Sequence, residues 1–308
     1  MSVLGINLLR LYLPLISWIG LGVLLGRKLP NAVPAGLGQF LFWIGVPLSI
    51  IGFLQQAELS ATVWMAPLIA WLAIGLGGSC AWLWLHRRST VPTSQPAQGS
   101  FILAAMVGNT GYLGYPIVLA LVGPKFFAWA VLYDTLGSTL GSYGLGAALA
   151  AHWGSRSLNN RQFLLAVIKN PALWSFWIGL GLRSINLPLA IEQLLRGCAW
   201  MMVAFALLLL GMRLSQISSG QRFQQAAVSL SIKMLIVPLL LGLALPYLGI
   251  SGAPQLVLVL QMAMPPAFAT LVLAEAYDLD RELTVTTLAM GSLLLLLLLP
   301  VWLWLFAI

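Results

Sequence analysis

The sequence predicts an all-α polytopic membrane protein with about ten transmembrane helices in two inverted five-helix repeats. Of the 308 residues, 60% are hydrophobic and only 7% are charged, whereas ordinary soluble domains carry roughly 25% charged residues. The apolar residues form runs near the ~20 residues that a bilayer requires, and prolines recur at corresponding places in the two halves. This composition excludes a soluble enzyme, a DNA-binding domain and a disordered chain.

The apolar runs predict the transmembrane spans and the division of the chain. The spans are expected at 6–26, 36–54, 62–86, 100–122, 125–150, 170–188, 192–213, 225–248, 254–276 and 283–307. The first run continues to Arg27 and Lys28 without a small-residue cleavage site, so we interpret it as a span and not as a cleavable signal. The predicted units are a first repeat at 1–151, a cytoplasmic linker at 152–169 and a second repeat at 170–308.

The basic residues predict the orientation in the membrane. Ten of the 15 Lys and Arg residues fall in the odd-numbered loops, and four fall on the opposite side. The positive-inside rule therefore predicts cytoplasmic odd loops and both termini on the non-cytoplasmic side of the cytoplasmic membrane. Because each half has an odd number of spans, related halves must be inverted. The net charge of +8 is interpreted as this topology signal, and no nucleic-acid partner is expected.

The fourth span contains an unusual polar segment, Gly108-Asn109-Thr110-Gly111-Tyr112-Leu113-Gly114-Tyr115-Pro116. Glycine permits unusual backbone angles, and Pro116 removes a helical hydrogen bond. A half-helix beginning here would direct its positive dipole end to the bilayer centre, where an anion can bind. We predict that Asn109, Thr110 and Gly111 bind substrate and that Gly114 and Pro116 form a crossover. The alternative is a kinked helix with small residues for packing.

The ninth span repeats the interruption with different chemistry. Pro265 and Pro266 are predicted to break it and to form the second crossover, because freed carbonyls in lipid require protein or a water-filled cavity. Gln261 and Thr270 are the candidate substrate-binding residues of this span. A helix–helix hydrogen bond is the alternative role for Gln261. No asparagine corresponds to Asn109, so the two segments are expected to be chemically unequal.

Two ionisable residues lie deep inside predicted spans, where such residues are costly and often functional. Asp134 in the fifth span is a candidate for carrying a proton or balancing charge, and a structural hydrogen bond or ion pair is the alternative. Lys233 in the eighth span could neutralise half-helix carbonyl ends or meet an anion, and snorkelling to the surface is the alternative.

Further residues receive structural interpretations. A face of small residues on the fifth span, which comprises Gly137, Ser138, Gly141, Ser142 and Gly144, is assigned to close helix packing. The acidic residues at the end of the ninth span are assigned to a solvated rim, and they are Glu275, Asp278, Asp280 and Glu282.

The segment 108–116 resembles the fourth-helix signature of the auxin efflux carrier family. Leu209–Leu214 is similar to the end of that family's seventh helix, Lys233–Leu240 to its eighth, and Met264–Tyr277 to its ninth. The resemblance implies inverted repeats with broken fourth and ninth helices, like the folds of sodium/proton antiporters and bile-acid symporters. It also implies a scaffold and a transport domain. The central linker is short, so regulation placed in a long central loop is not carried over to this chain. Auxin itself is not carried over as the substrate either.

The predicted function is a secondary active transporter for a small organic anion. The resemblance implies that this anion is a carboxylate or auxin-like acid and that it moves by elevator-type alternating access. A channel or membrane receptor is the alternative. No enzymatic motif is present, so no catalytic residue, metal site or cofactor is expected. The expected partners are the substrate and the lipid bilayer. A proton or sodium coupling ion and a homodimer are left open.

Overall fold

The computed structural model describes residues 3–30, 32–87, 94–154, 168–185, 187–215 and 222–306, and this part of the chain is helical apart from turns and one isolated bridge. Five of the described segments are long and apolar enough to cross a membrane: Ala32–Leu54, Ala61–Arg87, Leu189–Leu214, Phe223–Leu248 and Arg281–Phe306. Shorter apolar helices accompany them. The prediction of an all-α polytopic membrane protein is confirmed, and the ten-span inverted repeat stays a prediction.

Part of the predicted organisation falls outside the described residues. The expected linker 152–169 coincides largely with residues 155–167, which the structure does not describe. The loop bases Arg88, Arg156 and Arg161, which entered the orientation argument, also lie outside the described residues.

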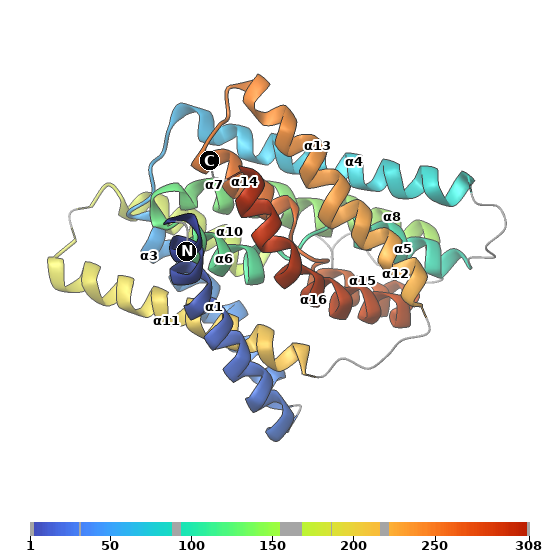
Figure 1. Cartoon of the computed structure of the whole chain (residues 1–308), viewed down its shortest axis with the longest axis horizontal. Helices are drawn as coiled ribbons and strands as arrows, with labels where there is room; N and C mark the ends of the chain where they lie inside the picture. Colours follow the sequence, from blue (N-terminus) through green and yellow to red (C-terminus); the bar gives the residue numbers. More distant parts are fainter. Residues whose placement is uncertain are drawn as a thin grey trace.

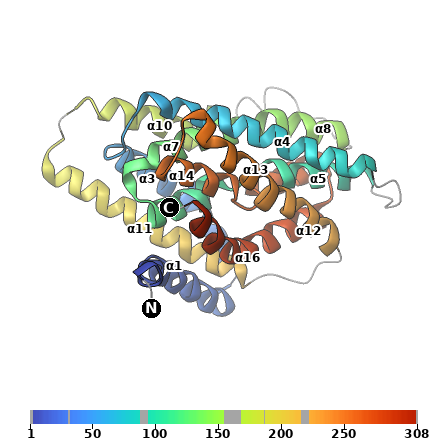
Figure 2. The same cartoon turned by 45° about the horizontal axis from the view of Figure 1, so that its top comes forward.

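A first group of helices lies along one edge of the molecule. It consists of α1 (Val3–Lys28), α2 (Ala32–Phe40), α3 (Val46–Leu54), α10 (Pro171–Leu182) and α11 (Leu189–Leu214). In Figures 1 and 2, α1 and α11 run side by side, away from α4. A Cβ atom on Gly22 would overlap the Leu208 carbonyl oxygen, and one on Gly211 would overlap the Ile19 carbonyl oxygen. These glycines therefore permit the close backbone approach that membrane helices use in place of a hydrophobic driving force.

The remaining helices form a second group. It consists of α4 (Met65–Arg87), α5 (Gln95–Met106), α6 (Tyr115–Leu121), α7 (Phe127–Leu132), α8 (Ala147–Trp153), α12 (Phe223–Ser231), α13 (Val237–Ala244), α14 (Ala253–Met262), α15 (Phe268–Tyr277) and α16 (Arg281–Phe306). Here α4 packs against α5, α12 against α16, and α13 against α14. The fifth predicted span links α7 to α8 through π-helical turns, including Tyr133–Thr139.

Three prolines inside helical segments are preceded by π-helical turns and do not interrupt the helix. Each turn ends two residues before the proline: Leu41–Gly45 before Pro47, Thr110–Gly114 before Pro116, and Ile232–Ile236 before Pro238. A proline lacks the N–H for the i−4 carbonyl and its ring collides with that carbonyl. A π-turn widens the helix at this point, so the chain continues.

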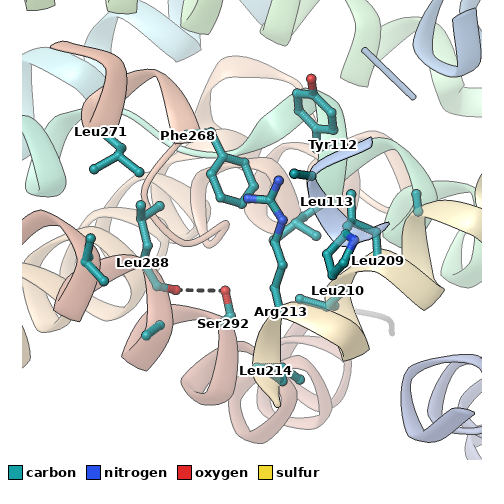
Figure 3. Close-up of a pocket in the computed structure, with 15 residues that line it drawn as sticks. Tyr112, Leu113, Leu209, Leu210, Arg213, Leu214, Phe268, Leu271, Leu288 and Ser292 are labelled. Carbon is teal, nitrogen blue, oxygen red and sulfur yellow. Dashed lines mark hydrogen bonds between the residues drawn. The ribbon is translucent and has the colours of Figure 1, made fainter. Parts of the chain in front are cut away.

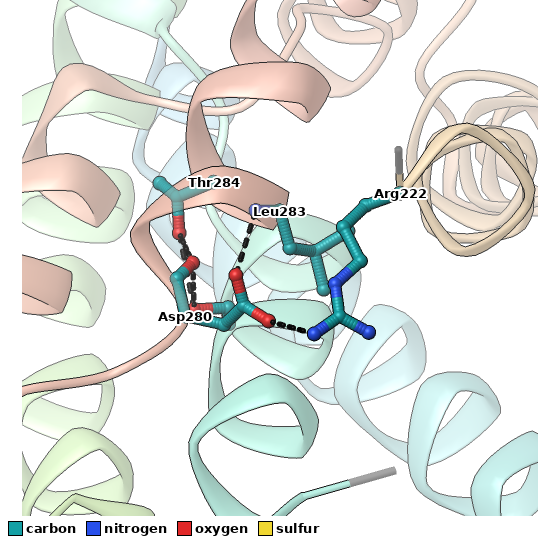
Figure 4. A network of polar contacts seen from close by, with 5 residues as sticks. Arg222, Asp280, Leu283 and Thr284 are labelled. Atoms are coloured by element: carbon teal, nitrogen blue, oxygen red, sulfur yellow. Dashed lines mark hydrogen bonds and ion pairs between the residues drawn. The ribbon is translucent and has the colours of Figure 1, made fainter. Parts of the chain in front are cut away.

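The junction before α16 contains a polar network that corrects one expectation (Figure 4). The carboxylate of Asp280 accepts the backbone N–H of Leu283 at 2.9 Å and pairs with Arg222 at 3.1 Å, and its side chain is only 10% exposed. The hydroxyl of Ser100 donates to the Asp280 carbonyl at 2.9 Å. The assignment of Asp280 to a solvated rim was therefore wrong, because its carboxylate caps a helix and joins α16 to the chain at Arg222. Glu275, in contrast, is half exposed.

Candidate substrate site

Two helices, one from each half of the chain, are interrupted and meet at their interruptions. Helical structure stops at Met106 and resumes at Thr110, and it stops at Met262 and resumes at Phe268. An isolated antiparallel bridge pairs Gly108 with Pro266.

The bridge supplies two backbone hydrogen bonds that join the extended segments. The Asn109 N–H donates to the Pro265 carbonyl at 2.7 Å, and the Ala267 N–H donates to the Val107 carbonyl at 3.1 Å. Pro266 itself lies opposite Gly108 in a pair that exchanges no hydrogen bond, so its missing N–H costs nothing. Non-helical backbone inside a membrane needs hydrogen-bond partners within the protein, and the bridge provides two such hydrogen bonds.

The first interruption lies at Val107–Asn109, and Pro116 lies inside the helical segment that follows it. Gly114 is in that segment too, directly against the side chain of Gln261: a Cβ atom on Gly114 would overlap the Gln261 Oε1 atom. Gln261 is 0% exposed, and neither atom of its amide has a hydrogen-bond partner among the described residues. Thr270 is also buried, and its hydroxyl donates to the Ala267 carbonyl at 2.7 Å. The structure therefore places Gln261 and Thr270 in the packing around the second interruption.

A polar cavity of about 280 Å³ lies beside the bridge. The first residues of both resumed helices line it. Of the five residues predicted to bind substrate, Asn109, Thr110 and Gly111 line it, and Gln261 and Thr270 do not. Its polar lining consists of Asn109, Thr110, Tyr112, Asp134, Ser138, Thr139, Ser142, Tyr143 and Asn170. The side-chain amide of Asn109 makes no hydrogen bond to a described residue, although Asn109 is buried and only 4% exposed. This amide is therefore available to a ligand.

Asp134 is the only charged residue among those that line the polar cavity. It is 6% exposed, and its carboxylate accepts hydrogen bonds from the hydroxyls of Thr110 and Tyr115, the latter at 2.8 Å. Thr110 thus connects Asp134 to the first interruption. The carboxylate has no basic partner among the described residues.

Lys233 is separate from the polar cavity. Its side chain is 2% exposed, and its ammonium group donates to the Met262 carbonyl at 2.8 Å. Met262 is the last residue of α14, so the cation lies at the negative end of a helix dipole. The structure thus places the Lys233 ammonium group at a half-helix carbonyl end and not at the surface.

Several residues of the polar cavity were missed by the sequence analysis. Ser138 and Ser142 were assigned to helix packing, but packing is the role of Gly137 and Gly141, which lie against Ala70 and Ile74. The serines lie about 100° further round the helix and line the cavity. Asn170 could have been found from the Asn-Pro pair at 170–171. Such a pair is typical of a helix start, and its side chain accepts the Ala172 N–H at 3.0 Å.

A second cavity, here called the Arg213 cavity, has a volume of about 300 Å³, and Figure 3 shows the residues that line it. Tyr112 and Phe268 line both cavities, and their rings meet edge to face with centroids 6.1 Å apart. Arg213, in the last turn of α11, lies over the Phe268 ring at 3.6 Å from its centroid. The sequence analysis counted Arg213 only as an orienting loop charge.

Comparison with known proteins identifies the family of this chain. A model of a membrane transport protein family matches residues 8–303. An "uncharacterized transporter" of Methanothermobacter thermautotrophicus is 30% identical over 253 residues, which cover 80% of each chain. Another uncharacterized transporter, from Methanocaldococcus jannaschii, is 26% identical over 195 residues, or 62% of each chain. The protein is a multi-pass membrane transporter and not an enzyme, and it belongs to the membrane transport protein family of the auxin efflux carriers.

Proposed function

We propose that the protein is a secondary active carrier that moves a small organic anion, a carboxylate or auxin-like acid, across the cytoplasmic membrane. One observation carries the proposal: two interrupted helices from different halves begin again, at Thr110 and Phe268, beside one polar cavity. Helix N-termini provide free N–H groups and a positive dipole end, which together favour an anion. Paired interrupted helices at corresponding places are typical of secondary transporters.

The anion is proposed to bind in the polar cavity to Asn109, Thr110 and Gly111. Asn109 offers an amide without a partner among the described residues, and Thr110 and Gly111 belong to the first turn after the interruption. The contacts of Gln261 and Thr270 favour a supporting role at the crossover, together with Gly114, Pro265 and Pro266. Pro116 lies in the helical segment after the first interruption, so we do not propose it as part of the crossover.

Coupling to a proton through Asp134 is part of the proposal. An ionised Asp134 would repel an anion held in the same cavity, whereas a protonated Asp134 would not. The protonated carboxyl would donate to the Thr110 oxygen, and the Thr110 hydroxyl could then donate to the Gly108 carbonyl, which lies 3.4 Å away. Proton binding would thereby alter the hydrogen bonds of the first interruption.

The packing of the helices supports an inverted repeat and an elevator-type mechanism. The contact of α1 with α11 has its counterpart in the contact of α10 with α3, and α12 with α16 has its counterpart in α4 with Tyr133–Thr139. Such paired contacts are expected if residues 1–151 and 170–308 are related by a two-fold axis in the membrane plane. The first helix group would be the scaffold, and the second group, which contains both interruptions, would move. Both termini would lie on the non-cytoplasmic side.

The test is transport by purified protein in proteoliposomes with a panel of radiolabelled carboxylates at two pH gradients. Asn109→Ala should lower the rate at least about tenfold, since a buried polar contact to a charged group is lost. Gln39→Ala, which alters an exposed amide on α2, is the matched control. Wild-type rates for Asn109→Ala with every carboxylate would refute the site.

Two further measurements test the carrier and its coupling. Saturable uptake with counterflow is expected of a carrier, and conductance without counterflow would identify a channel. Asp134→Asn should transport at a rate that no longer responds to the pH gradient. If the wild-type rate already ignores the pH gradient and follows a sodium gradient, the proton proposal fails.

A further inference from the structure

Arg213 forms no ion pair with an acidic residue in the part of the chain that the structure describes. All seven acidic residues lie in the described part of the chain, and none of them lines the Arg213 cavity. Three of them pair with other bases: Glu58 with Lys125, Asp280 with Arg222, and Glu275 with Arg281. Glu192 lies in the first turn of the same helix, 21 residues earlier, which is roughly 30 Å away.

The guanidinium of Arg213 also has donors to spare. It stacks over the Phe268 ring, and a stacked guanidinium keeps its in-plane N–H groups for other partners. Arg213 donates no hydrogen bond to any residue that the structure describes. A half-buried cation without an anionic partner is costly, so an anion from outside the chain would complete this site.

The walls of the cavity define what kind of anion fits. Apart from Arg213, the polar residues among the described residues of the lining are Tyr112 and Ser292. The hydroxyl of Ser292 donates to the Leu288 carbonyl at 2.8 Å within α16 (Figure 3). One base thus lies at the edge of a cavity whose other walls are aliphatic and aromatic, including Leu209 and Leu271.

We propose that the Arg213 cavity binds a small monocarboxylate, with its carboxylate on the Arg213 guanidinium and its apolar body against the leucines and Phe268. This inference rests on the proposed function, and it names the substrate class and a second anion-binding station for the same carrier. Tyr112 and Phe268 line both the station and the polar cavity, and Phe268 is the first residue of the resumed helix α15. A carboxylate on Arg213 would therefore lie next to a ring that also lines the polar cavity.

The same geometry disfavours dicarboxylates and neutral analogues. A second carboxylate would lie against apolar walls without a partner, which carries a large desolvation cost. A neutral alcohol would leave the guanidinium without its counter-charge. Hexanoate, adipate and hexan-1-ol form a matched series with one, two and no carboxylates.

The experiment is equilibrium binding of radiolabelled hexanoate to full-length protein in neutral-lipid nanodiscs, with adipate and hexan-1-ol as competitors. Both competitors should bind at least about tenfold more weakly than hexanoate. Arg213→Gln should weaken hexanoate binding at least about tenfold, and Arg213→Lys less, since Lys keeps the charge but not the planar fork. Lys28→Gln, which removes an exposed charge at the end of α1, is the control and should bind as the wild type does.

A second variant keeps the test informative if Arg213→Gln does not fold. Ala289→Leu narrows the cavity from α16 without touching the charge, and it should also weaken hexanoate binding. Unchanged hexanoate binding in both Arg213→Gln and Ala289→Leu would overturn the inference, as would adipate binding as tightly as hexanoate.

Two further measurements distinguish a lipid headgroup from a free carboxylate as the ligand, and the carrier proposal from the Arg213 site. If phosphatidylglycerol in the nanodisc displaces hexanoate from the wild type but not from Arg213→Gln, the station serves a lipid headgroup, and the monocarboxylate assignment is overturned. Binding that depends on Arg213, in a protein that transports no carboxylate, would refute the carrier proposal while keeping the site.

Discussion

The two interrupted segments share one β-bridge but differ in what their side chains contact. The segment around Asn109 faces the polar cavity and keeps an amide without a partner among the described residues. The segment around Pro265 is closed by side chains: Lys233 binds the last carbonyl of α14, Thr270 binds the Ala267 carbonyl, and Gly291 leaves room for both prolines. In the described structure, one interruption is thus open to a ligand and the other is braced. The amide of Gln261 also has no partner among the described residues, but it is 0% exposed and does not line the polar cavity.

This difference shows that structural likeness of the two interruptions does not make them equal in function. The same bridge joins both through two backbone hydrogen bonds. Their side chains decide the rest, because a polar group that is bonded within the protein has less to offer a ligand. Substitutions at the braced interruption should mainly lower stability, and substitutions at the open one should mainly lower transport.

The largest expected effect is at the contact between the two segments. Gly114→Ala should lower the free energy of unfolding by about 3 kcal/mol, because the added methyl overlaps the buried Gln261 side chain. Adding Gln261→Ala should restore more than half of the loss, which reversible unfolding in mixed SDS micelles can measure. If Gln261→Ala lowers the free energy of unfolding further, the contact between Gly114 and Gln261 is not the cause of the loss.

Lys233→Met should lower the free energy of unfolding by about 2 kcal/mol. The Met262 carbonyl would lose its donor in a fully buried position. Ser231→Ala, on the same helical segment, is the control, because the Ser231 hydroxyl only bonds back to Ala227 of its own helix. A more stable Lys233→Met protein would show that the buried charge costs more than the cap contributes.

Gly111→Ala tests the open interruption with the same chemical change as at Gly114. Its methyl would lie 3.2 Å from the Asp134 Oδ2 atom, in the polar cavity. Transport should fall about tenfold, or about 1.4 kcal/mol in the barrier, with the thermal midpoint unchanged. A large drop in the thermal midpoint, with transport at the wild-type rate, would show instead that the segment around Gly111 serves stability and not transport.

Thr270→Val should have the smallest effect, a loss of about 1 kcal/mol of unfolding free energy, since a single hydroxyl-to-carbonyl hydrogen bond is removed. The substrate concentration at half-maximal transport should stay within about twofold of the wild type. A selective rise in that concentration would instead identify Thr270 as a substrate-binding residue.

The fold and part of the site followed from local patterns. Apolar runs of bilayer length predicted the helices, and the polar segment 108–116 placed Asn109, Thr110 and Gly111, which line the polar cavity. The exact place of the interruption did not follow, because a proline such as Pro116 can be accommodated by a π-turn. Arg213 was missed because an orienting loop charge and a cavity charge have the same signature in sequence.

The sequence by itself determined that this protein lives in lipid, where its helices lie and which chain segments are unusual, since these depend on transfer free energies and on backbone chemistry of neighbouring residues. Only the tertiary structure decided that Gly108 meets Pro266, that Lys233 caps α14 and that Arg213 lies over Phe268. These pairs are distant along the chain, and no local preference fixes which of many buried polar groups will satisfy one another. That choice is made when the helices pack.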